Sequence, residues 1–183
     1  MEPSEKPFTI VPATTPEQLD TIRALFQAYA ISLGFSLAFQ DFTSELASLP
    51  GDYGPPGGLL YLAVSRTTGA AIGCLGLRPL KGKSNHATPV GAGEEGDRGT
   101  KKKIAEMKRL YCTPEARGLG VGAALVDLVL EGARELGYEE CWLDTLPTMG
   151  SARGLYLKRG FSEIEKYYDT PLEGTIFLGK KLA

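Results

Sequence analysis

A glycine-rich segment of six residues separates two strongly patterned apolar stretches of this 183-residue chain; it reads Arg117-Gly118-Leu119-Gly120-Val121-Gly122. The residues before it, 104–112, alternate as a β-strand does, and those after it, from about 120 to 136, repeat apolar side chains at helical spacing. Gly137 marks the end of this predicted helix. The chain must therefore pass from a strand into a helix through residues that carry few side chains.

A helix that begins directly after such a turn exposes its first backbone amides. These N–H groups have no partner within the helix, and the helix macrodipole adds about half a positive charge at the same end. A phosphate group is a natural ligand for this arrangement, and Arg117 can add a charge-assisted contact. The segment predicts a phosphate-binding turn.

Two common phosphate-binding motifs fit the segment poorly. The spacing from Gly118 to Ala123 formally meets the dinucleotide fingerprint, but in that fold the glycines follow the strand directly within a parallel unit. Here residues 113–117 intervene, and a predicted hairpin precedes the strand. A P-loop needs a Lys and then Ser or Thr, whereas Gly122 is followed by two alanines. A nicotinamide-dependent oxidoreductase and a nucleoside triphosphatase are therefore disfavoured.

Composition excludes several other classes. The chain has 20 Lys and Arg against 22 Asp and Glu, so no basic field attracts nucleic acid. No apolar run approaches the length of a membrane span, and the N-terminus lacks the features of a signal peptide. Three scattered cysteines predict neither disulfides nor a metal site. We expect a soluble, cytoplasmic monomer or homodimer without metal, membrane or nucleic-acid partners.

The rest of the pattern predicts one domain over residues 7–183. A helix begins at Thr15, which precedes Pro16 at a favourable first helical position. A long mobile loop is expected at about 81–100, where glycines are frequent and apolar residues almost absent. The other expected elements are strands at 7–13, 59–65, 70–80, 140–145, 161–168 and 174–182, and helices at 41–49 and 151–159.

Two blocks of the sequence resemble the GNAT superfamily of N-acetyltransferases. LYCTPEARGLGVGAALV resembles its acetyl-CoA-binding segment, whose pattern of Arg or Gln, two residues, Gly, one residue and Gly or Ala is filled by Arg117, Gly120 and Gly122. ARGLYLKRGF resembles its second block, filled by Tyr156, Gly160 and Phe161. The two blocks occur in the expected order about forty residues apart, which makes the joint resemblance far more specific than either block.

The resemblance implies an α/β (α+β) fold with a mixed, mostly antiparallel sheet flanked by about four helices. It also implies transfer of acetyl from acetyl-CoA to a primary amine by direct attack in a ternary complex. The pyrophosphate is then expected on the turn, and the pantetheine arm beside the preceding strand. The implied cofactor-binding residues are Leu110, Tyr111, Cys112, Arg117, Gly118, Leu119, Gly120, Val121, Gly122 and Ala123.

The proposed chemistry needs a base and an acid. The amine must be uncharged to attack, although a free alkyl amine has a pKa near ~10. Glu106, in mid-strand among apolar and cationic neighbours, is the first candidate base, and Asp144, which closes the next strand, is the second. By resemblance Tyr156 protonates the departing CoA thiolate, provided that its phenol pKa is lowered locally.

Several of these residues also have purely structural interpretations. Glu106 resembles an ordinary strand glutamate beside cations, and Tyr156 a core tyrosine. Cys112 is expected to be a small buried residue and not a nucleophile, because no histidine lies near it in the sequence. Many GNAT members carry Asn seven residues before the tyrosine, where this chain has Met149. A non-catalytic acyl-CoA-binding module that keeps the turn remains the alternative.

The acceptor stays open at this point. It is expected to be a small-molecule or peptide amine, and the sequence does not choose between an amino acid, a polyamine, an aminoglycoside and a protein terminus. Four aromatic residues either line the acceptor pocket or pack in the core, namely Tyr29, Phe35, Tyr167 and Tyr168.

Overall fold

The chain is described here by a computed structural model over residues 6–81 and 102–182. The loop expected at about 81–100 therefore lies, apart from its first residue, outside the described part of the chain. Within the described residues, no helix combines the length and the apolar character that a membrane crossing requires.

Seven strands form one sheet in the order β1-β2-β3-β4-β5-β7-β6. Only β4 and β5 pair in parallel, so the sheet is mixed and mostly antiparallel, as predicted. The strands are β1 (Phe8–Pro12), β2 (Leu59–Ser65), β3 (Ala71–Pro79), β4 (Ile104–Cys112), β5 (Glu140–Thr145), β6 (Ser162–Glu163) and β7 (Ile176–Lys181).

Four α-helices in the described residues flank this sheet, as predicted. The first begins as its sequence indicates, because the Thr15 side chain accepts a hydrogen bond from the amide of Gln18 and the Gln18 side chain accepts one in return. The helices are α1 (Pro16–Leu33), α2 (Phe42–Ser48), α3 (Val121–Glu135) and α4 (Gly150–Lys158), with short 3-10 turns η1 (Ala38–Gln40), η2 (Gly51–Tyr53) and η3 (Pro114–Ala116).

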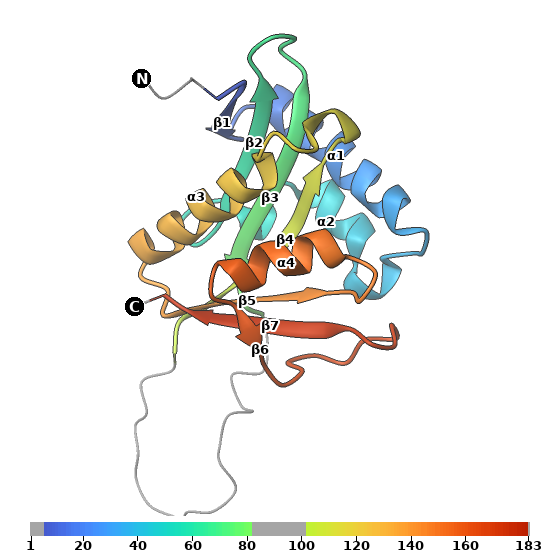
Figure 1. Ribbon diagram of the computed structural model, residues 1–183, viewed down its shortest axis with the longest axis vertical. Coiled ribbons are helices and arrows are strands. Elements are labelled where there is room, and N and C mark those ends of the chain that lie inside the picture. The colour runs from blue at the N-terminus through green and yellow to red at the C-terminus, as the bar shows by residue number, and fades with distance from the viewer. Residues whose placement is uncertain (1–5, 82–101, 183) are drawn as a thin grey trace, which may run out of the picture.

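The helices bury two separate apolar clusters. One cluster packs Val121, Leu125 and Val129 of α3 on sheet residues, and it includes Tyr156 of α4. The other packs Ile22 and Phe26 of α1 on β2 and β3. Helices therefore cover both faces of the sheet, with α3 and α4 nearer the viewer in Figure 1.

The sheet opens between its two parallel strands. Pairing of β4 with β5 ends at Glu106 and Trp142, while β4 continues along β3 as far as Cys112. Beyond Trp142, β5 stays paired only with β7, up to Thr145. The two halves of the sheet run in clearly different directions past this point (Figure 1). Residues from the ends of β4 and β5 line a cleft there.

The predicted strand at 161–168 is wrong in most of its length. Only Ser162 and Glu163 pair with β7, and the Ile164 amide still donates to the Phe177 carbonyl at 2.9 Å. The chain then leaves the sheet because Tyr167 turns inward, where its ring packs against Trp142 and Phe177. Burial of this aromatic ring outweighs the alternating pattern that predicted a longer strand.

Candidate active site

The glycine turn, residues 117–122, presents free backbone amides at the start of α3. Both Gly118 and Gly120 have a φ near +78°, in the left-handed region that favours glycine, and a Cβ at either position would meet no atom within 4 Å. Backbone conformation, and not lack of space, is therefore what requires glycine here. Residues 117–120 are all exposed.

The amides of this turn are available to a ligand. Among the hydrogen bonds of the described residues, none is donated by the amides of Gly118, Gly120, Val121, Gly122 or Ala123. The Leu119 amide differs, because it donates to the Ala116 carbonyl at 3.2 Å. Five of the predicted cofactor-binding positions therefore offer an N–H group, and Leu119 does not.

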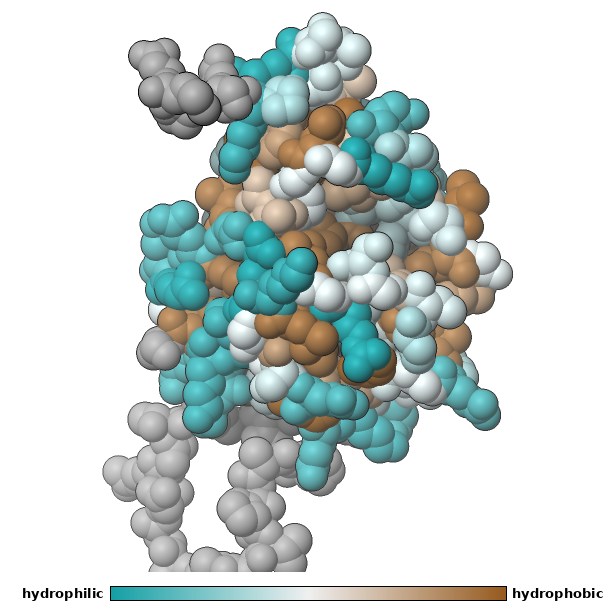
Figure 2. All heavy atoms as spheres, viewed as in Figure 1, coloured by the Kyte–Doolittle hydropathy of each residue, from teal (hydrophilic) through white to brown (hydrophobic). Residues whose placement is uncertain are grey.

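Apolar side chains meet behind the turn. A Cβ added to Gly122 would lie 3.5 Å from Cys112 Sγ and 3.6 Å from a Leu155 methyl, so β4, α3 and α4 meet there. Partly buried apolar side chains of the same elements pack against the core cluster, namely Leu110, Cys112, Ala124, Ala152 and Leu155. Figure 2 shows apolar surface between α3 and α4, framed by hydrophilic side chains.

The cleft between β4 and β5 brings predicted site residues together. Leu110, Asp144 and Tyr156 all line it. Met149 lines it as well and caps α4 without a side-chain hydrogen bond. The cleft is therefore shared by β4, which is expected to hold the pantetheine arm, by the candidate base Asp144 and by the candidate acid Tyr156.

Tyr156 is buried and lies at the cleft wall on α4. Its ring packs edge-on against the ring of Phe161, with the ring centroids 5.7 Å apart. Two residues of the second sequence block therefore pack against each other. Burial raises the pKa of Tyr156, and nearby Tyr29 and Asp144 raise it further. The local lowering that the sequence argument required is therefore not found, and the phenol holds its proton firmly at neutral pH.

Glu106 is buried behind the cleft, and both of its carboxylate oxygens accept hydrogen bonds. Its side chain is 5% exposed, and Oε2 accepts from Arg78 Nε at 2.9 Å and pairs with Arg78 Nη2 at 2.8 Å. Its other oxygen accepts from the Tyr167 hydroxyl at 3.0 Å. Glu106 is not among the described residues that line the cleft, whereas Asp144 is.

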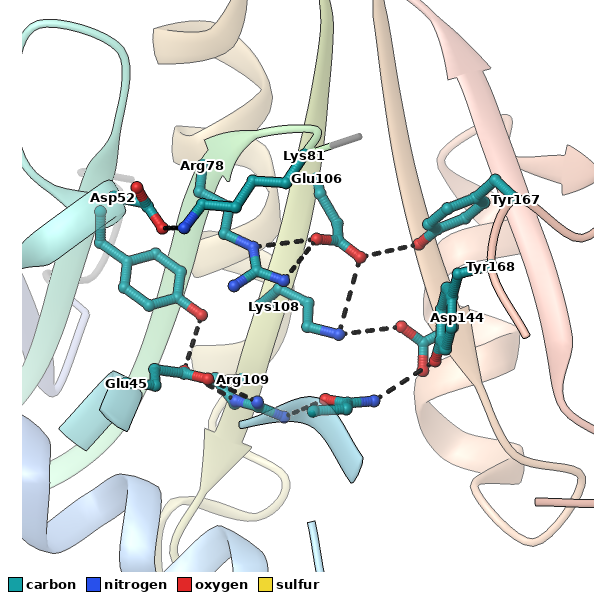
Figure 3. A network of polar contacts seen from close by, with 12 residues as sticks. Glu45, Asp52, Arg78, Lys81, Glu106, Lys108, Arg109, Asp144, Tyr167 and Tyr168 are labelled. Atoms are coloured by element: carbon teal, nitrogen blue, oxygen red, sulfur yellow. Dashed lines mark hydrogen bonds and ion pairs between the residues drawn. The ribbon is translucent and has the colours of Figure 1, made fainter. Parts of the chain in front are cut away.

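Lys108 connects the two candidate bases. Its ammonium donates to Asp144 at 3.1 Å and lies 3.6 Å from Glu106 (Figure 3). The Lys108 side chain is 5% exposed, and that of Asp144 is 18% exposed. Asp144 is therefore the more accessible of the two carboxylates and has one cationic partner.

Arg109 reaches the same region because β4 contains a bulge. Two β4 residues, Arg109 and Leu110, lie opposite the single residue Leu75 of β3, and Arg109 has a φ of +65°. The bulge lets both Lys108 and Arg109 enter the polar region, although neighbours in a regular strand point to opposite faces. Arg109 binds both oxygens of Glu45, at 2.9 and 2.6 Å, and donates to Gln40.

Six charged residues lie together here in two sets of ion pairs, and we call all six the charged cluster (Figure 3). One set contains Arg78, Glu106, Lys108 and Asp144, and the other contains Glu45 and Arg109. Sequence reasoning treated Lys108 and Arg109 only as neighbours of Glu106, and it missed Glu45. A signal was present, because three charges within an otherwise apolar strand indicate buried partners elsewhere.

The four aromatic candidates divide into two groups. Tyr29 and Phe35 line the cleft, as the acceptor-pocket interpretation predicted. Tyr167 and Tyr168 instead pack against each other and against Phe177, so core packing describes them better. Tyr168 keeps a link to the cleft, because its hydroxyl accepts from Gln40 at 3.3 Å.

Cys112 has the features expected of a small structural residue and not those of a nucleophile. It is half-buried at the end of β4, and burial raises the pKa of its thiol to about 11. A thiol with this pKa is almost entirely protonated at neutral pH and is a poor nucleophile. The cysteine therefore contributes an apolar contact behind Gly122.

The residues present fit a phosphate-bearing acyl carrier. The unpartnered amides suit phosphate, and the apolar side chains behind Gly122 suit an extended, weakly polar arm. Together the fold and the cleft define an acyltransferase.

Comparisons with known proteins agree with this class. Residues 22–161 match the model of the Acetyltransferase (GNAT) family. An uncharacterized N-acetyltransferase of Schizosaccharomyces pombe is 34% identical over 178 residues, which cover 97% of this chain and 96% of that protein. The chain belongs to the GNAT family and is an acyltransferase, as the sequence predicted.

Solved structures share the fold. A GNAT-family acetyltransferase of Staphylococcus aureus superposes with a TM-score of 0.69 at 18% identity, over 96% of this chain and 99% of that one. The NatC complex bound to Gag peptide and CoA contains a chain with a TM-score of 0.63 at 19% identity, over 96% and 99%.

Proposed function

We propose that this chain transfers an acetyl group from acetyl-CoA to a primary amine by direct attack in a ternary complex. One observation carries the proposal. Asp144, Tyr156 and the bulged end of β4 line a single cleft, and the chain runs on from the end of β4 to the unpartnered amides of the glycine turn. The GNAT family generally uses acetyl-CoA, and the NatC relative was solved with CoA.

The chain's own residues suit each part of this cosubstrate. Pyrophosphate would accept hydrogen bonds from the amides of Gly118 and of residues 120–123, with Arg117 near it. The pantetheine arm would lie beside Leu110, Tyr111 and Cys112. When bound, acetyl-CoA supplies an activated acetyl group as a thioester.

We assign the base to Asp144 in preference to Glu106. What supports this choice is access, because Asp144 lines the cleft while Glu106 is closed off by Arg78 and Tyr167. The Asp144 carboxylate would take a proton from the acceptor ammonium, either directly or through a water. Glu106 would act through Lys108 as a positioning residue.

We assign the acid to Tyr156. Its raised pKa keeps the phenol protonated, so a proton is available to the departing thiolate. The same raised pKa opposes full ionisation of the phenol, so its proton must be replaced as it leaves. The proton that the attacking amine nitrogen releases balances this transfer. Holding amine and thioester together supplies much of the acceleration, since effective molarities of about 10⁵ to 10⁸ M are accessible.

Acetyl-CoA turnover with an amine panel tests this function. The enzyme should release free thiol only when an acceptor amine is present, while CoA affinity alone would fit a binding module as well. Asp144→Asn should lower kcat/KM roughly 100-fold. Glu106→Gln should lower it less at a temperature where both variants are folded, and the reverse order would assign the base to Glu106.

A further inference from the structure

Part of the cleft lining is apolar. Leucine and phenylalanine side chains reach it from the end of α1, from the segment after α1, from the end of β5 and from the loop between β6 and β7. We call these residues the apolar wall; they are Leu33, Phe35, Leu37, Leu146 and Leu172. These residues come from three separate parts of the chain and line the same cleft as Asp144.

Both cations at this cleft are already compensated. Arg109 is 2% exposed and binds Glu45 with two hydrogen bonds. Lys108 is held between Asp144 and Glu106. Among the described residues that line the cleft, no other cation is present. A carboxylate carried by the acceptor would therefore be buried against leucines without a partner, which is strongly unfavourable.

A second ammonium on the acceptor would also lack a counter-charge in the cleft. Asp144 is the one acidic residue among the described side chains that line the cleft. Any further ammonium, as in a polyamine or an aminoglycoside, would lie on the apolar wall and lose its hydration without gaining a counter-charge. The cleft thus has a place for one amine and for an apolar group attached to it.

On the basis of the proposed function, we infer that the acceptor is a primary amine that carries an apolar substituent and neither a neighbouring carboxylate nor a second ammonium. The shared chemistry covers a small apolar amine and a peptide whose first residue is apolar, since a peptide bond removes the carboxylate charge. Of the four acceptor classes that the sequence left open, free amino acids, polyamines and aminoglycosides are disfavoured.

Matched acceptors test the inference. 3-Methylbutylamine and leucine differ only by the carboxylate, and butylamine and 1,4-diaminobutane differ only by the second ammonium. At one pH, we expect kcat/KM for thiol release to be at least tenfold higher for the first member of each pair. A short peptide that begins with leucine is then compared with 3-methylbutylamine. This comparison shows whether the acceptor is a peptide or a small apolar amine, and a preference for either one agrees with the inference.

Two variants test whether the apolar wall causes this preference between acceptors. Leu33→Lys adds a cation to the apolar wall and should narrow the ratio between 3-methylbutylamine and leucine several-fold. Ile31→Lys adds the same charge on the same helix but outside the cleft, where Ile31 is 80% exposed, and should leave the ratio unchanged. Because the ratio is internal to each variant, partial loss of folded protein does not alter it.

Two results would overturn the inference in different ways. Equal or faster turnover of leucine or of 1,4-diaminobutane would reject the acceptor class while leaving the acetyl transfer intact. Absence of amine-dependent thiol release with every acceptor, despite CoA binding, would reject the proposed function and the inference together.

Discussion

The glycine turn and the charged cluster are the two polar regions of the candidate active site, and they are built in opposite ways. The turn is exposed, local in sequence and offers backbone amides without partners among the described residues. The cluster is buried, contains residues from Glu45 to Asp144 and has its charges paired.

This difference indicates that the glycine turn suits ligand binding and that the charged cluster holds side chains in position. Unpartnered amides at a helix start are available to a ligand and lose little when one binds. Paired buried charges resist change, because removing one partner leaves the other charge without compensation in a poorly hydrated site. We therefore expect variants of the turn to change cosubstrate affinity and variants of the cluster to change stability or turnover.

The largest effect is expected from Glu45→Ala. This change leaves the Arg109 guanidinium buried without its carboxylate, which costs about 3–5 kcal/mol of unfolding free energy. Asp127→Ala is the matched control, because it removes an ion pair with Arg159 whose carboxylate is 59% exposed, and it should cost about 0–1 kcal/mol. Urea denaturation measures both, and equal losses would contradict the distinction between buried and exposed pairs.

Tyr156→Phe should have the next largest effect, on turnover. Loss of the proton donor is expected to lower kcat roughly 100-fold, or ~2.7 kcal/mol, while CoA affinity stays unchanged. Tyr138→Phe is the control, since Tyr138 is equally buried but donates to the Gly57 carbonyl. Steady-state kinetics with calorimetric CoA binding separate the two quantities. Unchanged kcat in Tyr156→Phe would remove the acid role.

Gly120→Asp should weaken CoA binding roughly tenfold or more, or ~1.4 kcal/mol. The added carboxylate lies beside the expected diphosphate and opposes the helix dipole. Gly120→Asn has nearly the same shape and also tolerates the left-handed backbone, so it should bind CoA several-fold more tightly than the aspartate variant. If the two variants bind CoA equally, charge at this position has no role and the diphosphate lies elsewhere.

The smallest effect concerns pH and Glu45. Burial alone would raise the pKa of this carboxyl, but the hydrogen bonds and the charge of Arg109 outweigh burial and leave it below its usual 4.5. A lowered pKa in the folded state stabilises the fold above pH 4.5, and this contribution is lost as the pH falls through the folded-state pKa.

The stability difference between wild type and Glu45→Gln should therefore narrow between pH 6 and pH 3. Urea denaturation at several pH values measures it. A difference that stays constant over this range would show that Glu45 and Arg109 are not coupled as described.

Prediction from sequence succeeded where the signal is local. The strand 104–112, the turn and the helix that follows are each set by neighbouring residues, and the structure confirms them as β4, the glycine turn and α3. The β4 bulge was not predicted, because Arg109 reaches a positive φ while bound to Glu45, which lies 64 residues away in the sequence. The early end of β6 has the same origin, since Tyr167 is held by Trp142, Phe177 and Glu106.

The order of the two candidate bases changed for a similar reason. In the sequence, Glu106 is more prominent than Asp144, because it stands among apolar residues in a strand that the family resemblance emphasises. In the fold, Arg78 and Tyr167 cover Glu106, and neither residue lies near it in the sequence. Accessibility depends on such distant contacts, and no local pattern records them.

The sequence by itself determined the class of protein, the helix start that suits phosphate and the tyrosine that the cleft contains. These features depend on glycine conformations, helix periodicity and short motifs, all of which act over a few residues. Only the tertiary structure decided which carboxylate faces the cleft, which charges cancel and how apolar the acceptor side is. Those properties depend on which distant side chains are packed together, and burial and charge compensation exist only once the chain has folded.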